Sequence, residues 1–392
     1  MIYCKKCIMP NTRPGIIFDD NGVCSPCNWS KKKTEVDWES RKKDLFDICN
    51  WAKKLSKNKW GCVLGVSGGK DSIWQAFTLR DKFKINPLLV QYLSSDGTEL
   101  GRKNIETLQK QGFDLITFQP NPIIASKLAK KSFLNYGNID KYSEYSLFSI
   151  PFRIAINFGI PLVFFGENPA MEAGDTNSEN APWDASGIIN NNTLSGGDLS
   201  IWLDNKISKK DILPYFFPSN NEIKKWGGKA IFMGYFLNWS GWMNAKFAIS
   251  KGMNLIKANY EEIGIHYKHN SLDSNNGAMV NSMLKHIKLG LGNVTEFSCY
   301  DIREGRLSRL EAAALAKAFD GKCHNKYIMD FCKWIGISKK DFWIVANSFR
   351  GKMWEKKGYW KLKNPIWEQL QGISDIKIKK ILNSINTEKF KI

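Results

Sequence analysis

Residues 62–72 read CVLGVSGGKDS, an apolar run that passes without a break into a glycine-rich turn. The apolar part predicts a buried strand, and apolar residues at helical spacing after residue 72 predict that a helix begins at the turn. Consecutive glycines let the backbone turn tightly and bring its N–H groups close to an anion, and the positive end of the helix points at the same place. The stretch therefore predicts a phosphate-binding loop.

The segments around this loop repeat the order of strand and helix. Apolar strands are expected at 88–93, 113–118 and 161–165, separated by helical patterns such as 99–110. Apolar strands that alternate with helices are typical of a parallel sheet covered on both faces. The expected fold class is α/β and Rossmann-like, with a small metal module before the sheet and a helical region after it.

The loop is not a Walker A motif, because Leu64 stands where that motif has its first glycine and Asp71 follows the lysine in place of Ser or Thr. It resembles instead the Ser-Gly-Gly-x-Asp-Ser signature of the PP-loop ATP pyrophosphatases, which have the adenine nucleotide alpha hydrolase-like fold. This resemblance implies that ATP binds and is cleaved at its α-phosphate. Asp71 is the expected Mg²⁺ ligand, and Lys70 is expected to neutralise the leaving pyrophosphate. The expected ATP-binding residues of the loop are Ser67, Gly68, Gly69, Lys70, Asp71 and Ser72.

Two Cys-x-x-Cys pairs stand near the N-terminus, and 16 residues separate them. Two such pairs supply four thiolates for a tetrahedral Zn²⁺, and four protein ligands leave no open position for catalysis. We therefore expect a structural zinc site, although this spacing alone also permits an iron–sulfur or redox role. The expected ligands are Cys4, Cys7, Cys24 and Cys27.

The composition is that of a globular protein with a strong positive charge. Lys and Arg outnumber Asp and Glu by 57 to 38, which gives a net charge of +19 and favours anionic ligands. No apolar run is long enough to cross a bilayer, and the first residues lack the apolar core of a signal peptide, so a cytoplasmic location is expected. The aromatic residues near the basic C-terminal end are expected to pack a helix pair: Trp354, Tyr359, Trp360 and Trp367.

Changes in composition along the chain suggest three regions. Residues 1–58 form the expected zinc module with a connecting helix, 59–240 the PP-loop ATP-binding domain, and 241–392 a helical region for substrate or partner. The four histidines show no clear metal spacing, and we expect structural roles for them.

The cysteines also narrow the kind of PP-loop enzyme. PP-loop enzymes that thiolate tRNA usually need a persulfide-carrying cysteine near the nucleotide, and no cysteine lies between Val63 and Ser298. The chain also lacks a glutaminase nucleophile, since Ile2 follows the initiator Met and no Gly-x-Cys-x-Gly elbow occurs. If the nucleophile is ammonia, another polypeptide must deliver it. A PP-loop tRNA-modifying enzyme remains the alternative, and nucleic acid is otherwise not an expected partner.

The whole pattern resembles the N-acetyl sugar amidotransferases of surface-polysaccharide and nonulosonic acid biosynthesis. The resemblance covers about residues 1–355 and is carried by the Cys-x-x-Cys pairs, the PP-loop, TELGRKN at 98–104, FFGENPA at 164–170 and GYF at 234–236. It implies an ATP-dependent ligase of LPS O-antigen type pathways that converts an acetamido group to an acetamidino group. The implied partners are a HisH-like glutaminase and a HisF-like synthase subunit, and the implied substrate is an anionic nucleotide- or lipid-linked sugar.

Further site residues are expected where strands end, because ligands of open parallel sheets collect at the carboxyl edge. Gln91, where the family usually has Asn, and Gly166 are expected near ATP. Glu167 is expected to assist Mg²⁺ or orient ammonia. The expected substrate contacts are Asn168, Glu172 and Arg303.

Overall fold

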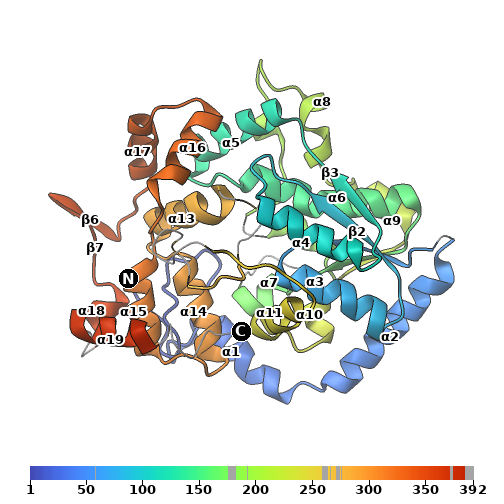
Figure 1. Ribbon diagram of the computed structural model, residues 1–392, viewed down its shortest axis with the longest axis horizontal. Coiled ribbons are helices and arrows are strands. Elements are labelled where there is room, and N and C mark those ends of the chain that lie inside the picture. The colour runs from blue at the N-terminus through green and yellow to red at the C-terminus, as the bar shows by residue number, and fades with distance from the viewer. Residues whose placement is uncertain are drawn as a thin grey trace.

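The computed structural model describes residues 1–57, 59–174, 182–191, 193–257, 264, 266–270, 274, 276–370 and 374–384. Its centre is a parallel five-stranded sheet with strand order β3-β2-β1-β4-β5, seen on the right of Figure 1. The strands are β1 (Cys62–Gly65), β2 (Pro87–Tyr92), β3 (Leu115–Phe118), β4 (Leu162–Phe165) and β5 (Lys229–Phe232).

Alternate residues of the strands face opposite sides of the sheet, and both sides are buried. Leu64 and Phe164 lie in one core, and Val63 and Val163 lie in another. The first core is completed by α2 (Trp38–Leu55), α3 (Lys70–Phe77), α4 (Glu99–Lys110) and α11 (Gly241–Ser250), and the second by α6 (Lys141–Phe158). The α/β fold class with a doubly covered parallel sheet is confirmed.

A second group of helices packs beside the sheet, at the upper left of Figure 1. Helices α5 (Pro122–Tyr136), α13 (Asn281–Leu289), α16 (Asn325–Ile335) and α17 (Lys339–Ser348) share one apolar core with α6 and with residues 194–215. This core therefore joins segments from before and after residue 240. The remaining short helices are α7 (Pro169–Ala173), α8 (Lys209–Ile212), α9 (Asn220–Trp226) and α10 (Met233–Phe236).

The N-terminal segment packs against the C-terminal helices. Cys4, Cys7 and Cys24 share a core with α14 (Asn293–Arg303), α15 (Arg309–Phe319) and α18 (Ile366–Gln369). Arg309 holds this contact by donating to the backbone oxygens of Cys7 and Cys4 at 2.9 and 2.8 Å. The connecting helix α2 belongs instead to the core of the sheet, so residues 1–58 contribute to two separate cores. Helices α1 (Ser25–Lys32) and α19 (Asp375–Ser384) complete this end of the structure.

Two elements differ from the sequence expectations. Strand β5 was not among the predicted strands, although its residues fall inside 59–240, the expected ATP-binding domain. The prediction that the C-terminal aromatic residues pack a helix pair is wrong for Trp354, Tyr359 and Trp360, because β6 (Trp354–Lys357) and β7 (Tyr359–Leu362) form an antiparallel hairpin that projects at the left of Figure 1. Trp367 does lie on a helix, α18, and packs against the core that contains α14 and α15. Gly358, at φ +72°, supplies the turn. Part of the basic C-terminal end, 371–373 and 385–392, lies outside the described residues.

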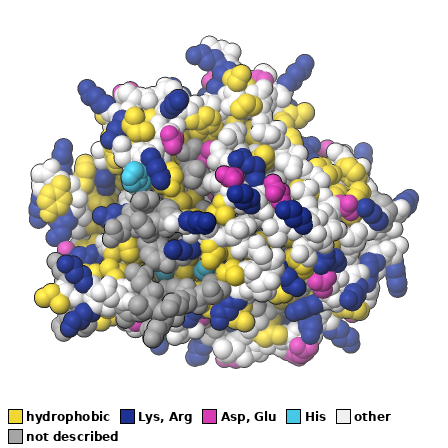
Figure 2. All heavy atoms as spheres, in the orientation of Figure 1, with side chains coloured by type: hydrophobic (Ala, Val, Ile, Leu, Met, Phe, Trp, Pro, Cys, Tyr) yellow, Lys and Arg dark blue, Asp and Glu magenta, His cyan; other side chains and the backbone are white. Residues whose placement is uncertain are grey.

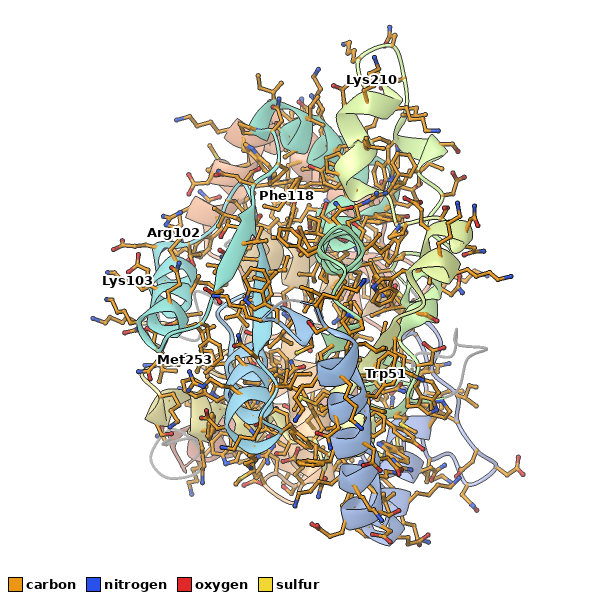
Figure 3. The ribbon with its side chains drawn as sticks, turned by 90° about the vertical axis from the view of Figure 1, so that its right-hand side faces the viewer. Trp51, Arg102, Lys103, Phe118, Lys210 and Met253 are labelled. Carbon is orange, nitrogen blue, oxygen red and sulfur yellow. The ribbon has the colours of Figure 1, made fainter. Side chains whose placement is uncertain are left out.

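On the face seen in Figure 2, the positive charge is distributed rather than gathered. Figure 2 shows Lys and Arg side chains spread over the visible face, with Asp and Glu between them. Figure 3 shows Arg102 and Lys103 pointing outward from α4. None of the helices within the described ranges has the length and apolar content needed to cross a lipid bilayer.

Candidate functional site

The glycine-rich loop leaves β1 and enters α3 as the sequence predicts. Gly68 has φ +79°, and a side-chain carbon built there would lie 2.9 Å from the carbonyl oxygen of Gly101, so the position requires glycine. Gly69 is the N-cap of α3 and has no side-chain oxygen that could accept from the N–H groups of the first turn. The hydroxyl of Ser72 instead donates to the carbonyl oxygen of Gly69 at 3.0 Å. The N–H groups at the start of α3 therefore have no side-chain cap, which fits an anion.

Three charged side chains meet beside this helix end. Lys70 Nζ lies 2.6 Å from Asp71 Oδ2, and Asn244 donates to Asp71 Oδ1 at 2.8 Å. Glu167, just beyond the end of β4, exposes its carboxyl to the same cleft. The protein atoms that surround Glu167 raise the pKa of its carboxyl, and the negative charge of Asp71 raises it further. Two neighbouring carboxylates that repel each other are a suitable donor set for a hard divalent cation.

These residues line a cleft of about 130 Å³ between the sheet and the C-terminal helices. Helix α3, Glu167 and Glu172 form one wall. The opposite wall is largely aromatic and carries a few polar groups. A cleft of this size holds reacting groups and not a complete nucleotide, because pockets for whole ligands measure about 300–1,000 Å³. The residues of the opposite wall include Trp242, Tyr267, His269, Phe297, Tyr300, Asp301 and Arg306.

The polar part of this wall is a buried ion-pair network. Arg306 Nη2 lies 2.7 Å from Asp301 Oδ1, and His266 Nε2 lies 3.2 Å from Asp301 Oδ2. Although burial opposes it, the hydrogen bond with His266 and the charge of Arg306 hold the pKa of Asp301 below its usual value. Burial and the nearby charge of Lys70 lower the pKa of His269 to about 3, so this imidazole is neutral at physiological pH.

Glu172 lies in the cleft as a firmly held carboxylate. Its Oε1 accepts from Lys33 Nζ at 2.7 Å and from Trp29 Nε1 at 3.3 Å. Both donors belong to α1 and the turn after it, directly behind the cysteine pair at 24–27. The N-terminal segment therefore supplies part of the support for the cleft.

Three other expected residues serve the local structure. The amide oxygen of Asn168 accepts from the backbone N–H of Ala170 at 2.9 Å and caps α7, and Asn168 is buried. Gln91 is buried and accepts from the Thr117 hydroxyl at 3.1 Å. Gly166 lets Trp239 approach, since a side-chain carbon there would lie 3.1 Å from the Trp239 ring. Asn168 and Gln91 thus have structural partners where contacts to sugar and ATP were expected.

Arg303 lies behind the cleft rather than in it. Its guanidinium stacks on Tyr300 at 4.4 Å and donates to the backbone oxygen of Glu172 at 3.3 Å. Among the described residues that line the cleft, Arg306 supplies the guanidinium instead. Sequence reasoning also missed Trp242, Tyr267 and His269. The sequence shows aromatic and imidazole side chains at Tyr267, His269 and Phe297, which could have suggested a ligand site. No local pattern in the sequence links these residues to the phosphate-binding loop.

The four N-terminal cysteines form the expected cluster. Their sulfur atoms all lie within 4.8 Å of one another, with Cys4 and Cys27 at 4.0 Å and Cys7 and Cys24 at 3.6 Å. A tetrahedral zinc with bonds of about 2.3 Å places its sulfurs about 3.8 Å apart, so the cluster fits this geometry. Backbone N–H groups of Lys6 and Cys24 donate to the sulfur of Cys4 at 3.3 and 3.2 Å, as expected for a thiolate ligand. The cluster can hold a metal ion, and its identity as zinc remains a prediction.

Comparisons with known proteins give partial matches. Compared with the solved structure of NMN synthetase from Francisella tularensis, this chain has a TM-score of 0.26 and 16% sequence identity. The match covers 33% of this chain and 54% of that chain. An uncharacterized protein of Methanocaldococcus jannaschii is 32% identical over 103 residues, which are 24% of this chain and 36% of that protein. The matches thus span about a third to about half of the length of these proteins. Residues 259–368 match the family described as LPS biosynthesis protein WbpG-like, C-terminal domain. The segment that supplies most of the aromatic wall of the cleft is therefore similar to a domain of an LPS biosynthesis protein.

Proposed function

We propose that this protein is the synthetase subunit of a glutamine-dependent sugar amidotransferase. In this reaction the acetamido oxygen of an N-acetyl sugar attacks the α-phosphorus of ATP, and pyrophosphate leaves. Ammonia then attacks the resulting imidate carbon, AMP leaves, and the sugar carries an acetamidino group. The product would enter LPS O-antigen or nonulosonic acid biosynthesis.

The observation that carries the proposal is the juxtaposition of two kinds of wall in one cleft. Lys70 and Asp71 of the PP-loop face an aromatic surface from the segment similar to the WbpG-like domain. Aromatic side chains with a few fixed polar groups are typical of sites for small organic ligands. We assign Trp242 and Tyr267 to the sugar ring, and Arg306 to an anionic group of the substrate. Glu172, held by Lys33, can accept a hydroxyl group of the sugar.

The loop residues perform the first step by positioning and charge. The uncapped N–H groups at the start of α3 bind the phosphates, and Lys70 offsets the charge that gathers on the leaving pyrophosphate. Asp71 and Glu167 would hold Mg²⁺, which supplies further neutralisation of phosphate charge when bound. His269 is neutral and can donate or accept a hydrogen bond without adding charge. None of the described residues that line the cleft is a cysteine, which favours ammonia over a sulfur carrier as the nucleophile.

The same proposal includes partner proteins that supply ammonia and a role for zinc in the four-cysteine cluster. Ammonia would come from a HisH-like glutaminase working with a HisF-like synthase subunit. Zinc in the four-cysteine cluster would fix the N-terminal segment against α14 and α15 and would take no part in the chemistry. The sugar would be nucleotide- or lipid-linked.

The test is AMP formation by the purified protein. With ATP, Mg²⁺, ammonium and nucleotide-linked N-acetyl sugars, we expect AMP, pyrophosphate and a sugar in which NH replaces oxygen, detected by mass spectrometry. Arg303→Met and Arg306→Met form a matched pair, because only Arg306 lines the cleft. We expect the larger rise in KM for the sugar from the change at Arg306.

Two results would reject the proposal. Release of ADP in place of AMP would show that the loop does not direct cleavage to the α-phosphate. AMP release that tRNA stimulates and N-acetyl sugars do not would favour the alternative, a PP-loop enzyme that modifies tRNA.

A further inference from the structure

A second and larger cavity shares no lining residue with the cleft in the part of the chain that the structure describes. Its volume is about 660 Å³, within the range of pockets that hold whole small ligands. Glu296 of α14 lines this cavity, whereas Phe297 and Tyr300 line the cleft. The other walls come from the end of α5, the start of α6, residues 193–201 and α13. The PP-loop contributes nothing to its lining among the described residues.

Four cationic side chains line the cavity, and they fall into two kinds. Arg13 and Lys285 both pair with Glu296, Arg13 at 3.3 Å. Lys141 and Lys288 donate hydrogen bonds to neutral backbone oxygens: Lys141 donates to Thr193, and Lys288 donates to Tyr136 at 2.7 Å. Lys141 Nζ also lies 5.3 Å from the centre of the Tyr136 ring. A carbonyl oxygen is neutral, so it satisfies the hydrogen-bond donor but does not neutralise the positive charge of the ammonium group.

The surroundings make this charge costly. Burial lowers the pKa of Lys141 and of Lys288, and the positive charge of Lys141 lowers the pKa of Lys288 further. Glu144 offsets part of the charge of Lys141. Asp198 also lines the cavity, but it is exposed to solvent and accepts from the backbone N–H of Ser200 at 2.8 Å. A dianion between the two lysines would relieve the repulsion and regain part of the lost solvation.

We propose that this cavity binds the phosphate group of an organic phosphate ester, with Lys141 and Lys288 as its ligands. Tyr136 provides an aromatic surface for the organic part of the ligand, and the buried ring of Tyr145 lies behind the cavity wall with its hydroxyl bonded to the Leu194 oxygen at 3.0 Å. The site is separate from the PP-loop, so the proposal does not depend on the reaction assigned to the cleft.

Isothermal titration of the full-length protein with three probes tests this site. The probes are inorganic phosphate, uridine diphosphate and farnesyl diphosphate, titrated without Mg²⁺. The first is free phosphate, and the other two separate a nucleotide source of the ester from a lipid source. We expect binding of one ester that weakens at least about tenfold in Lys288→Met, because hydrogen bonds to charged groups are strong. Lys141→Gln should weaken the same probe.

Two variants serve as controls. Lys103→Met removes one positive charge from an exposed position on α4 (Figure 3) and should leave binding unchanged. Lys70→Met removes the lysine of the PP-loop, and any loss of binding there should be smaller than in Lys288→Met. Lys288→Met should remain folded, since it removes a charge that burial disfavours, and Lys288→Arg should retain binding. The proposal is overturned if no ester binds, or if esters bind no better than phosphate. Equal binding by Lys288→Met and the wild type, or equal loss in Lys103→Met or Lys70→Met, would also overturn it.

Discussion

Lys33 donates a hydrogen bond from Nζ to Oε1 of Glu172 at 2.7 Å, although 139 positions separate the two residues in the chain. The same ammonium group donates to the backbone oxygen of Trp239 at 2.6 Å. Lys33 follows α1, which begins immediately after Cys24 and contains Cys27. A short, continuous path therefore runs from the cysteine cluster to a carboxylate of the cleft.

Replacing Lys33 by Met tests how much this contact contributes to stability. The side chains of Lys33 and Glu172 are 14% and 9% exposed, so the change leaves a nearly buried carboxylate with fewer donors. We expect the free energy of unfolding to fall by about 2–3 kcal/mol in urea denaturation. The control is Lys42→Met, whose pair with Glu39 is 52% and 83% exposed and should contribute less than about 1 kcal/mol. Equal losses in the two variants would contradict this assignment.

Removing the metal should loosen the same path. In Cys24→Ser we expect loss of bound zinc by elemental analysis and a lower midpoint of thermal unfolding, because structural zinc contributes directly to folding. The matched control is Cys323→Ser, a half-buried cysteine outside the cluster, which should keep its metal. The structural role would be disproved if the wild-type protein were purified without metal and its unfolding midpoint were the same before and after exposure to a chelator.

The sequence predicts the sheet well because its signals are local. An apolar strand, a glycine turn and a helical period all lie within about a dozen neighbouring residues, and β1, β2, β3 and β4 follow that pattern. Strand β5 has four residues, Lys229–Phe232, as do β1, β3 and β4, so its length does not explain why it was missed; it follows the short helix α9 and runs directly into α10, without the loop that follows the other strands. The hairpin was missed because aromatic side chains in 354–362 are equally compatible with a buried helix, and the only turn signal between the two short strands is the single residue Gly358.

The site is harder to predict because it is assembled from distant segments. The phosphate loop and the cysteine pairs are self-contained motifs, whereas the Lys33–Glu172 contact leaves no pattern in the sequence. Arg303 and Arg306 show that site residues can be hard to predict even when they are close together in the sequence. Helix α14 ends at Arg303, and the turn at Gly305, with φ +75°, brings Arg306 back to Asp301 in the cleft. Composition alone does not tell which arginine faces the substrate.

Two glutamates should respond to pH in opposite ways. The pKa of Glu167 is raised above its ordinary value of 4.5, so its contribution to stability is lost as pH rises through the folded pKa. Lys285 and Arg13 outweigh burial and lower the pKa of Glu296, so its contribution is present above 4.5 and is lost as pH falls through the folded pKa. Without divalent cations, Glu167→Gln should stabilise the protein at about pH 8 and have little effect at about pH 4.

The comparison variant is Glu296→Gln, measured by urea denaturation over the same pH range. It should destabilise the protein at neutral pH, and its effect should shrink as the medium becomes acid. If both variants change the free energy of unfolding in the same direction at neutral pH, the assignment of Glu167 as a carboxylate destabilised by its surroundings and by the charge of Asp71 is incorrect. Added Mg²⁺ should stabilise the wild type more than Glu167→Gln, because only the wild type offers both carboxylates.

The tight loop makes a sharp prediction about Gly68. In Gly68→Ala the new carbon meets the Gly101 oxygen at 2.9 Å, and the positive φ adds strain. Gly159→Ala is the control, because Gly159 also has a positive φ, +63°, but a side-chain carbon there meets nothing within 4 Å. We expect Gly159→Ala to lower the free energy of unfolding by about 1–2 kcal/mol and to leave AMP formation unchanged. Gly68→Ala should lower the free energy of unfolding further and should abolish AMP formation. Normal turnover in Gly68→Ala would show that the phosphate-binding loop takes no part in the reaction.

Trp242 gives the most direct test of the substrate wall. It lies in the cleft, with the Arg306 guanidinium 5.1 Å from its ring. If the ring packs against the sugar, Trp242→Ala should raise KM for the sugar by about 5–30-fold, equivalent to about 1–2 kcal/mol, while KM for ATP stays constant. Trp242→Phe should recover part of this loss, and Trp343→Ala on α17 should show none of it. A fall in kcat with unchanged KM for the sugar would instead place the contribution of Trp242 in the transition state, and the ring would then act on the reacting group rather than on the sugar as a whole.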